Sequence, residues 1–342
     1  MSSAVFTALP GLEIPVAAIP ESFGALWARA AREGGPSPAN DDAKATQVNL
    51  VLHLGFGATP ADGLAQFQTA VNFSRRHPCR VVVLCPLPID DASTAEIRAK
   101  IHGECFTGKT PGDTRCCEFV MLSYPMSARR HLESQVSICL SADLPLYYWV
   151  HRFEDASRLA DYQHLFLNSQ RVILDSAVLP ESFKTHRWPC PENMRDLAFA
   201  RLLSARQAIG QFLSACPPAG LVKNLSAIRV THDTARAAEA AALLAWARDR
   251  LIACGLPETV PAAIAAANPA PADTAAPPAL SLDFEYDARA SKSRFHWHWL
   301  LDPKTNSGVS RLDADLCHGP VEMETPLALP APEESLAEAM FF

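Results

Sequence analysis

Residues 103–110, GECFTGKT, match the phosphate-binding pattern GxxxxGK[ST] at every required position. That chemistry needs a buried strand before the loop and a helix after it, so that backbone amides converge on phosphate. Here the preceding residues 94–102 are charged and helical in character, while Pro111 and Gly112 would break a following helix. We therefore predict that this pattern does not form a P-loop.

A second loop that could hold an anion is LGFGATP, residues 54–60, which joins a predicted strand to a predicted helix. A glycine loop that leads into a helix N-terminus can bind phosphate through its amides. The glycines here do not complete the GxGxxG fingerprint of a dinucleotide site. A tight turn is the favoured interpretation. A phosphometabolite or nucleotide sensor that uses Gly55, Gly57 and Thr59 is the alternative.

Two histidines in RFHWHW could ligate a metal, because alternation along a strand puts His296 and His298 on one face. The same alternation puts three aromatic residues on the other face: Phe295, Trp297 and Trp299. Two ligands do not make a zinc site, and no third ligand stands at a defined spacing. We predict no metal site here, but an aromatic face packed on a helix with solvated histidines outside.

Ten cysteines are present, without a CxxC motif or the paired Cys/His spacing of a zinc site. They are expected to be mostly reduced, buried thiols, with a redox-sensing pair as the alternative. The chain also has no GxSxG and no HExxH motif. We therefore predict a protein that is not an enzyme and has no catalytic residues, no cofactor and no metal.

Charged residues gather at the ends of predicted elements between residues 143 and 212. Two short apolar strands, 143–151 and 171–176, are followed by the polar segment 195–212. Six polar side chains lie at their ends: His151, Arg152, Asp175, Asp196, Arg201 and Arg206. Strand ends of an open α/β sheet are where ligands and partners bind. A binding role is favoured over chemistry, because no nucleophile has a base beside it.

Strands and helices alternate through the first half of the chain. Strand 47–54, the helix that opens at Thr59 and Pro60, and strand 80–84 predict a βαβ unit with parallel strands. The fold class predicted is α/β: an N-terminal doubly wound, mostly parallel α/β domain followed by an α+β domain with an antiparallel meander. The predicted organisation is a Pro/Ala-rich segment with one helix at 1–45, the α/β domain at 46–178, and the α+β domain at 179–342 with a linker at 257–279.

Composition excludes several classes of protein. Hydrophobic residues make up 49% and charged residues 20% of the 342, which is typical of a globular protein. The formal charge of −7 disfavours a nucleic-acid partner. The first 28 residues contain no Lys or Arg, and the uncharged run 259–272 is short and broken by prolines. We expect a cytoplasmic protein with no membrane segment.

Four motifs in register resemble the OpcA family, the assembly protein of glucose-6-phosphate dehydrogenase: HPCRVVVL (77–84), DLPLYYW (143–149), RVILDS (171–176) and DLAFARL (196–202) with Arg206. The resemblance runs from about residue 46 to the C-terminal LAEAM segment. The family usually has Trp where this chain has Phe199, and a TPWR-like helix start where this chain has SAR.

The resemblance implies a non-catalytic partner that binds glucose-6-phosphate dehydrogenase, favours its active oligomer and raises its activity. It points to seven positions for a partner interface or a small anionic effector site: Trp149, Arg171, Asp175, Asp196, Phe199, Arg201 and Arg206. The alternative for two of them is a structural ion pair between Asp196 and Arg201.

Overall fold

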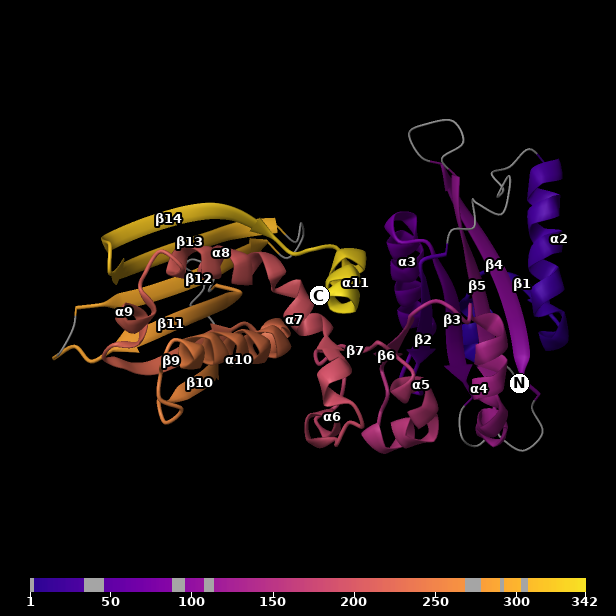
Figure 1. Ribbon diagram of the computed structural model, residues 1–342, viewed down its shortest axis with the longest axis horizontal. Helices are drawn as coiled ribbons and strands as arrows, with labels where there is room; N and C mark the ends of the chain where they lie inside the picture. The colour runs from indigo at the N-terminus through magenta and orange to yellow at the C-terminus, as the bar shows by residue number, and fades with distance from the viewer. Residues whose placement is uncertain are drawn as a thin grey trace, which may run out of the picture. The chain divides into compact units, whose positions relative to one another are not determined.

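The computed structural model describes residues 3–33, 46–87, 96–107, 114–267, 278–289, 292–302 and 307–342. The chain forms two compact units (Figure 1). Unit 1 comprises Met1–Leu197 together with Pro332–Phe342, and unit 2 comprises Ala198–Ala331. The C-terminal helix is therefore part of the same unit as the N-terminal half of the chain.

Unit 1 is built on an eight-stranded sheet with the order β1-β4-β5-β3-β2-β6-β7-β8. Neighbours from β5 to β8 in this order run parallel, whereas β4 is antiparallel to both β5 and β1. The strands are β1 Leu12–Ile14, β2 Val48–Leu54, β3 Cys79–Pro86, β4 Arg98–Thr107, β5 Thr114–Tyr124, β6 Leu146–His151, β7 Arg171–Leu174 and β8 Met194–Asp196. The mostly parallel sheet predicted for this part of the chain is confirmed.

The helices of unit 1 are α1 Ala4–Ala8, α2 Ile19–Arg32, α3 Pro60–Arg76, α4 Arg129–Cys139, α5 Gln163–Leu167, α6 Ser182–Thr185 and α11 Pro332–Phe341. Helix α3 begins with the predicted cap, because the Thr59 side chain and the Asp62 carboxylate each accept the other's backbone N–H. Side chains of α2, α4 and α5 share one core with strands β2 to β6. Helix α3 contacts α1 and α11.

The helix predicted over residues 94–102 is wrong, because Arg98–Thr107 form strand β4 beside β5. Alternate residues Ala99 and Ile101 are buried in the core. Lys100 is buried beside them, and its ammonium donates to the carbonyls of Phe6 at 2.7 Å and Leu9 at 2.9 Å. The first part of the GECFTGKT pattern thus lies in a strand, and residues 108–110 lie outside the described residues.

Unit 2 contains a six-stranded mixed sheet with the order β10-β9-β11-β12-β13-β14. Its elements are α7 Leu197–Arg201, α8 Leu203–Leu213, α9 Pro218–Val222, β9 Leu225–His232, α10 Ala237–Ala253, β10 Ala262–Ala266, β11 Leu280–Tyr286, β12 Arg294–Asp302, β13 Ser307–Leu316 and β14 Gly319–Ala328. Strands β11 to β14 form the predicted antiparallel meander, while β9 and β10 pair in parallel. The stretch expected to be a linker, 257–279, includes β10, and its residues 268–277 are outside the described residues.

Strand β12 shows the predicted division of its two faces. Phe295, Trp297 and Trp299 are each 1% exposed in the core of unit 2, on the side of α8 and α10. His296 and His298 lie on the opposite face, where the His296 ring is bonded to the Asp283 carboxylate. Of the helices in the described residues, none is long and apolar enough to cross a membrane.

Candidate functional site

Strands β2 and β6 are neighbours in the sheet, but the chain continues from β2 to β3 on one side and from β6 to β7 on the other. The carboxyl ends of two such strands form the usual ligand-binding crevice of an open α/β sheet. Here the two loops lie against each other. The amide of Gly55 donates to the carbonyl of His151 at 2.7 Å, and that of Gly57 donates to the carbonyl of Arg152 at 3.2 Å. A Cβ at Gly55 would stand 2.4 Å from the Arg152 oxygen, so this close approach requires glycine.

The predicted anion loop has further amides that bind protein groups. Ala58 N–H donates to Gly55 O, and Thr59 N–H donates to the Asp62 carboxylate at 3.0 Å. The same carboxylate binds the Arg152 guanidinium at 2.8 Å. These contacts place the negative charge of Asp62 at the N-terminus of α3. They also occupy the backbone amides that would otherwise bind a phosphate. The geometry therefore favours the tight turn over an anion site.

The seven predicted interface residues fall in both units. Trp149, Arg171, Asp175 and Asp196 belong to unit 1, whereas Phe199, Arg201 and Arg206 belong to unit 2. Trp149 is 1% exposed, so its ring is not a surface anchor in this structure. Burial lowers the pKa of the neighbouring His151 to about 4, which keeps that imidazole neutral at pH 7.

Arg171 lies beside Arg195, a residue that the sequence did not single out. Ile173 of β7 pairs with Arg195 of β8, so alternation puts Arg171 on the same face of the sheet. Burial lowers the pKa of the Arg195 guanidinium, and the Arg171 charge lowers it further. Arg171 donates to the carbonyl of Gln170, and Arg195 donates to the carbonyls of Glu192 and Met194. Two neighbouring guanidinium groups bound to neutral carbonyls can attract an anion.

Asp175 and Asp196 organise the turn that follows β7. The Asp175 carboxylate accepts the amide of Ala177 at 3.0 Å, and the Asp196 carboxylate accepts the amide of Ser176 at 3.1 Å. Both are side-chain to backbone bonds of the kind that fix tight turns. These carboxylates therefore shape the loop between β7 and β8.

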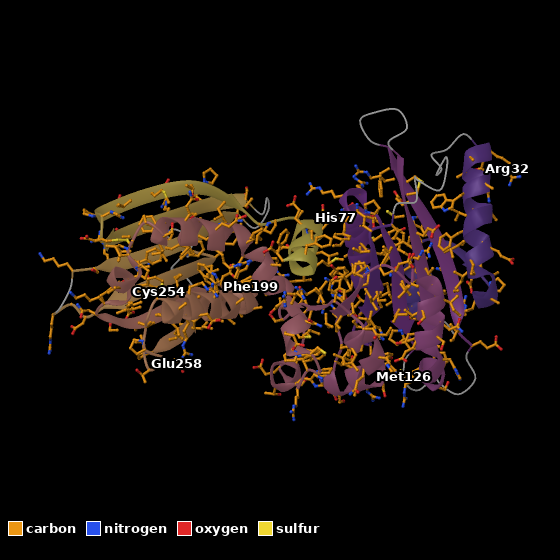
Figure 2. The ribbon with its side chains drawn as sticks, in the orientation of Figure 1. Arg32, His77, Met126, Phe199, Cys254 and Glu258 are labelled. Atoms are coloured by element: carbon orange, nitrogen blue, oxygen red, sulfur yellow. A yellow bond between two sulfur atoms is a disulfide. The ribbon has the colours of Figure 1, made fainter. Side chains whose placement is uncertain are left out.

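In unit 2, Phe199 of α7 contacts Arg206 of α8. The Arg206 guanidinium carbon lies 3.7 Å from the centre of the Phe199 ring, a cation–π contact. Figure 2 shows Phe199 on α7. Both side chains are half-buried. The pair joins the end of α7 to the first turn of α8.

Arg201 donates to Glu239 of α10 at 2.8 Å, and Arg236 lies 3.5 Å from the same carboxylate oxygen. The Glu239 side chain is only 2% exposed, so this Arg–Glu–Arg triad is largely removed from water. Sequence reasoning missed Glu239, because an acidic residue in the first turn of an Ala-rich helix reads as solvent-facing. Arg201 thus has a structural role in unit 2.

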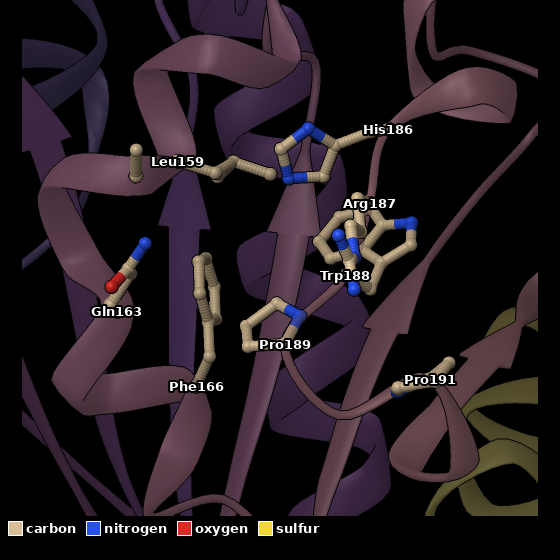
Figure 3. Close-up of a pocket in the computed structure, with 9 residues that line it drawn as sticks. Leu159, Gln163, Phe166, His186, Arg187, Trp188, Pro189 and Pro191 are labelled. Carbon is tan, nitrogen blue, oxygen red and sulfur yellow. The ribbon is translucent and has the colours of Figure 1, made fainter.

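A groove in unit 1 with a volume of about 670 Å³ was also missed. Its lining comes from α5, the turns before it, and the segment that precedes β8: Leu159, Ala160, Gln163, Phe166, His186, Arg187, Trp188, Pro189 and Pro191 (Figure 3). Phe166 and Trp188 meet edge to face with ring centres 6.3 Å apart. Trp188 is half-buried and Arg187 is exposed. An accessible Trp beside an Arg is the composition of a protein-binding hot spot.

The cysteines depart from the expectation of reduced, structural thiols at four positions. Cys105 is bonded to Cys116, its directly opposite neighbour on β5, and Cys216 is bonded to Cys317. The other six are free thiols in the structure: Cys79, Cys85, Cys117, Cys139, Cys190 and Cys254. Burial raises the pKa of Cys85 to about 12 and of Cys139 to about 11, so these two are unreactive structural thiols.

One buried polar network lies in the core of unit 1. His53 is 0% exposed, and its Nδ1 contacts the Tyr148 hydroxyl while its Nε2 lies 2.8 Å from the Tyr124 hydroxyl. Tyr124 and Tyr162 hydroxyls are 2.7 Å apart, and Tyr162 donates to Met126 Sδ at 3.8 Å. In one consistent arrangement, the Tyr148 hydroxyl donates to Nδ1 and Nε2–H donates to the Tyr124 hydroxyl. Tyr124 then donates to Tyr162, so each of the three hydroxyls has an acceptor. Burial lowers the pKa of His53 to about 3, so the ring is neutral.

Comparisons with known proteins support the resemblance. Residues 70–194 match the family model described as "Glucose-6-phosphate dehydrogenase subunit N-terminal domain". The chain is 24% identical over 188 residues to the "Putative OxPP cycle protein OpcA" of Synechocystis sp. (strain ATCC 27184 / PCC 6803 / Kazusa), which is 53% of this chain and 39% of that relative. The match therefore spans less than half of the relative's own length.

Proposed function

We propose that the chain is an OpcA-family protein and, on that basis, a non-catalytic partner of glucose-6-phosphate dehydrogenase in the oxidative pentose phosphate pathway. In this proposal it binds the dehydrogenase, promotes its active oligomer and raises its activity. The observation that carries the proposal is the match of residues 70–194 to a dehydrogenase-subunit domain.

The Trp188 groove is the surface that we propose for contact with the dehydrogenase. Its lining residues lie within the matched range 70–194. It offers an aromatic wall with Arg187 at its rim, and fully desolvated aromatic and Arg side chains supply most of the affinity in many interfaces. Trp188 thus replaces the buried Trp149 as the proposed aromatic anchor.

The Arg171 and Arg195 pair is the proposed second point of contact, for an acidic side chain of the partner or for a small anionic effector. Asp175 and Asp196 support it indirectly, because they fix the turn that follows β7. For Phe199, Arg201 and Arg206 we retain an interface role on unit 2 as a proposal, alongside the structural contacts of these residues.

The proposal is tested by titrating the same organism's purified dehydrogenase with this protein, with activity and complex size followed together. Saturable activation and a larger particle by light scattering are expected. Trp188→Ala should weaken the complex by roughly thirtyfold, the effect of losing a hot spot of about 2 kcal/mol. The matched control is Ile138→Ala, which removes an apolar side chain that is 63% exposed on α4 and does not line the groove.

Each outcome bears on a different part of the proposal. Unchanged rate and particle size at saturating protein would refute the partner function. Activation that Trp188→Ala leaves intact would refute the groove but keep the function. An effector at the arginine pair predicts a rise in melting temperature with glucose 6-phosphate that Arg195→Gln abolishes.

A further inference from the structure

The turn between β13 and β14 places two metal-binding side chains on the surface of unit 2. Cys317 and His318 occupy the middle of this turn, since Leu316 pairs with Gly319. Gly319 has φ of +78° and supplies the left-handed residue that closes the turn. The turn therefore does not require Cys or His at its two central positions. Both side chains are exposed, so core packing does not require them either.

Cys216 approaches the same point from the end of α8. It is buried and is bonded to Cys317, from which it is separated by 101 residues, with their Cα atoms 5.8 Å apart. Ligand atoms of Cys216, Cys317 and His318 all lie within 4.8 Å of one another. Across the described part of the chain, this is the one group of three or more Cys, His, Asp or Glu side chains that meets this condition.

The orientation of His318 is fixed by the backbone next to Cys216. Its Nε2 lies 2.6 Å from the carbonyl oxygen of Ala215. Because a carbonyl can only accept, Nε2 carries the proton and Nδ1 presents a free lone pair. A ring nitrogen that donates to a backbone carbonyl while the other nitrogen binds metal is the usual arrangement of a metal-binding histidine.

We propose that the reduced chain binds one Zn²⁺ ion through Cys216 Sγ, Cys317 Sγ and His318 Nδ1. Zinc bonds of about 2.3 Å to sulfur and about 2.0 Å to nitrogen place tetrahedral ligand atoms roughly 3.5 to 3.8 Å apart. The two sulfurs and one ring nitrogen of His318 lie within 4.8 Å of one another, so small movements reach the required spacing once the sulfurs are no longer bonded to each other. Cys317 and His318 are exposed, so the fourth position faces solvent and takes water.

The disulfide and the zinc site are alternative states of the Cys216 and Cys317 sulfurs. A phosphine reductant transfers two electrons to the S–S bond, gives two thiols, and becomes a phosphine oxide with oxygen from water. Zinc then displaces the two thiol protons, so each ion bound releases two protons and affinity rises with pH. Either state ties the β13–β14 turn to the end of α8.

The test is a Co²⁺ titration of the full chain after reduction with phosphine and anaerobic desalting. We expect one Co²⁺ per chain with thiolate-to-cobalt charge-transfer absorption and the visible bands of a tetrahedral ion, displaced by Zn²⁺. Cys216→Ser should remove the charge-transfer signal from one sulfur. His318→Ala should lower the affinity for Co²⁺ by at least about tenfold, because even loss of a group that only orients a ligand costs about 10- to 100-fold.

The second cysteine pair of the chain supplies the matched control. Cys105 and Cys116 are also bonded, but they are not in the three-ligand group. The double variant Cys105→Ser/Cys116→Ser should retain the full cobalt spectrum. Since His318 is exposed, His318→Ala should still fold and still form the Cys216–Cys317 disulfide without reductant. A reduced wild-type chain without the thiolate spectrum, or a spectrum and affinity unchanged in His318→Ala, would overturn the proposal.

Discussion

Protonation of His53 should destabilise unit 1 in acid, because its ring is fully buried among the tyrosine hydroxyls. Burial lowers its pKa in the folded chain to about 3 from the ordinary 6.5. The unfolded chain therefore binds a proton first as pH falls. The stability contributed by the neutral ring is complete above about pH 6.5 and is lost progressively as pH falls toward about 3.

The size of this effect follows from linkage. One pKa unit corresponds to 1.36 kcal/mol, so at pH 5, about 1.5 units below the unfolded value, the loss is roughly 2 kcal/mol. The assay is hydrogen exchange of the β2 and β6 amides, corrected for the intrinsic rate at each pH, since it reports the opening free energy of unit 1 itself. His53→Gln keeps a donor and an acceptor but does not titrate. The wild-type and variant curves should therefore approach each other by roughly 2 kcal/mol from pH 7 to 5.

His296 provides a matched control, because its contribution to stability should depend on pH in the opposite direction. The Asp283 carboxylate raises the pKa of His296 in unit 2 through a direct hydrogen bond. The stability that the protonated His296 contributes to unit 2 is therefore present below the pKa of the unfolded chain and is lost as pH rises through the raised pKa of the folded chain. His296→Gln should therefore lower the stability of unit 2 at low pH. Parallel pH profiles for wild type and His53→Gln would refute the argument that the buried neutral ring controls the acid stability of unit 1.

Other predictions concern burial and backbone approach. Glu239→Ala should destabilise unit 2 by about 3 kcal/mol in urea unfolding, because it leaves two partly buried guanidinium groups without their shared, buried carboxylate. The control Glu285→Ala, which breaks a half-exposed ion pair, should cost at most about 1 kcal/mol. Gly55→Ala should destabilise unit 1 by about 1 to 3 kcal/mol through the clash with Arg152 O, whereas Gly24→Ala on α2, where nothing lies within 4 Å, should be neutral or stabilising. Equal melting temperatures for the two glycine variants would contradict this.

The sequence was sufficient where the signal is local. The capping box at Thr59 and Asp62, followed by Pro78 after the helix, predicts α3 and the parallel pair β2 and β3, because caps and breakers act within a few residues. Alternation in β12 likewise predicts its aromatic face. The sequence-based prediction failed for β4, because its charged residues are typical of a helix, while the carbonyl groups that bind the Lys100 ammonium lie more than 90 residues away in the chain.

The mostly parallel sheet, the meander and the four family motifs are all predictable from the sequence, since periodicity and motif order are carried by neighbouring residues. Which side chains contact one another becomes visible only in the folded chain. Arg171 with Arg195, Arg201 with Glu239, and Cys216 with Cys317 and His318 are separated by 24 to 102 positions in the chain. Side-chain chemistry alone does not specify a partner at that distance, because any charge or thiol has many partners of matching type. The fold selects one by bringing its backbone within reach.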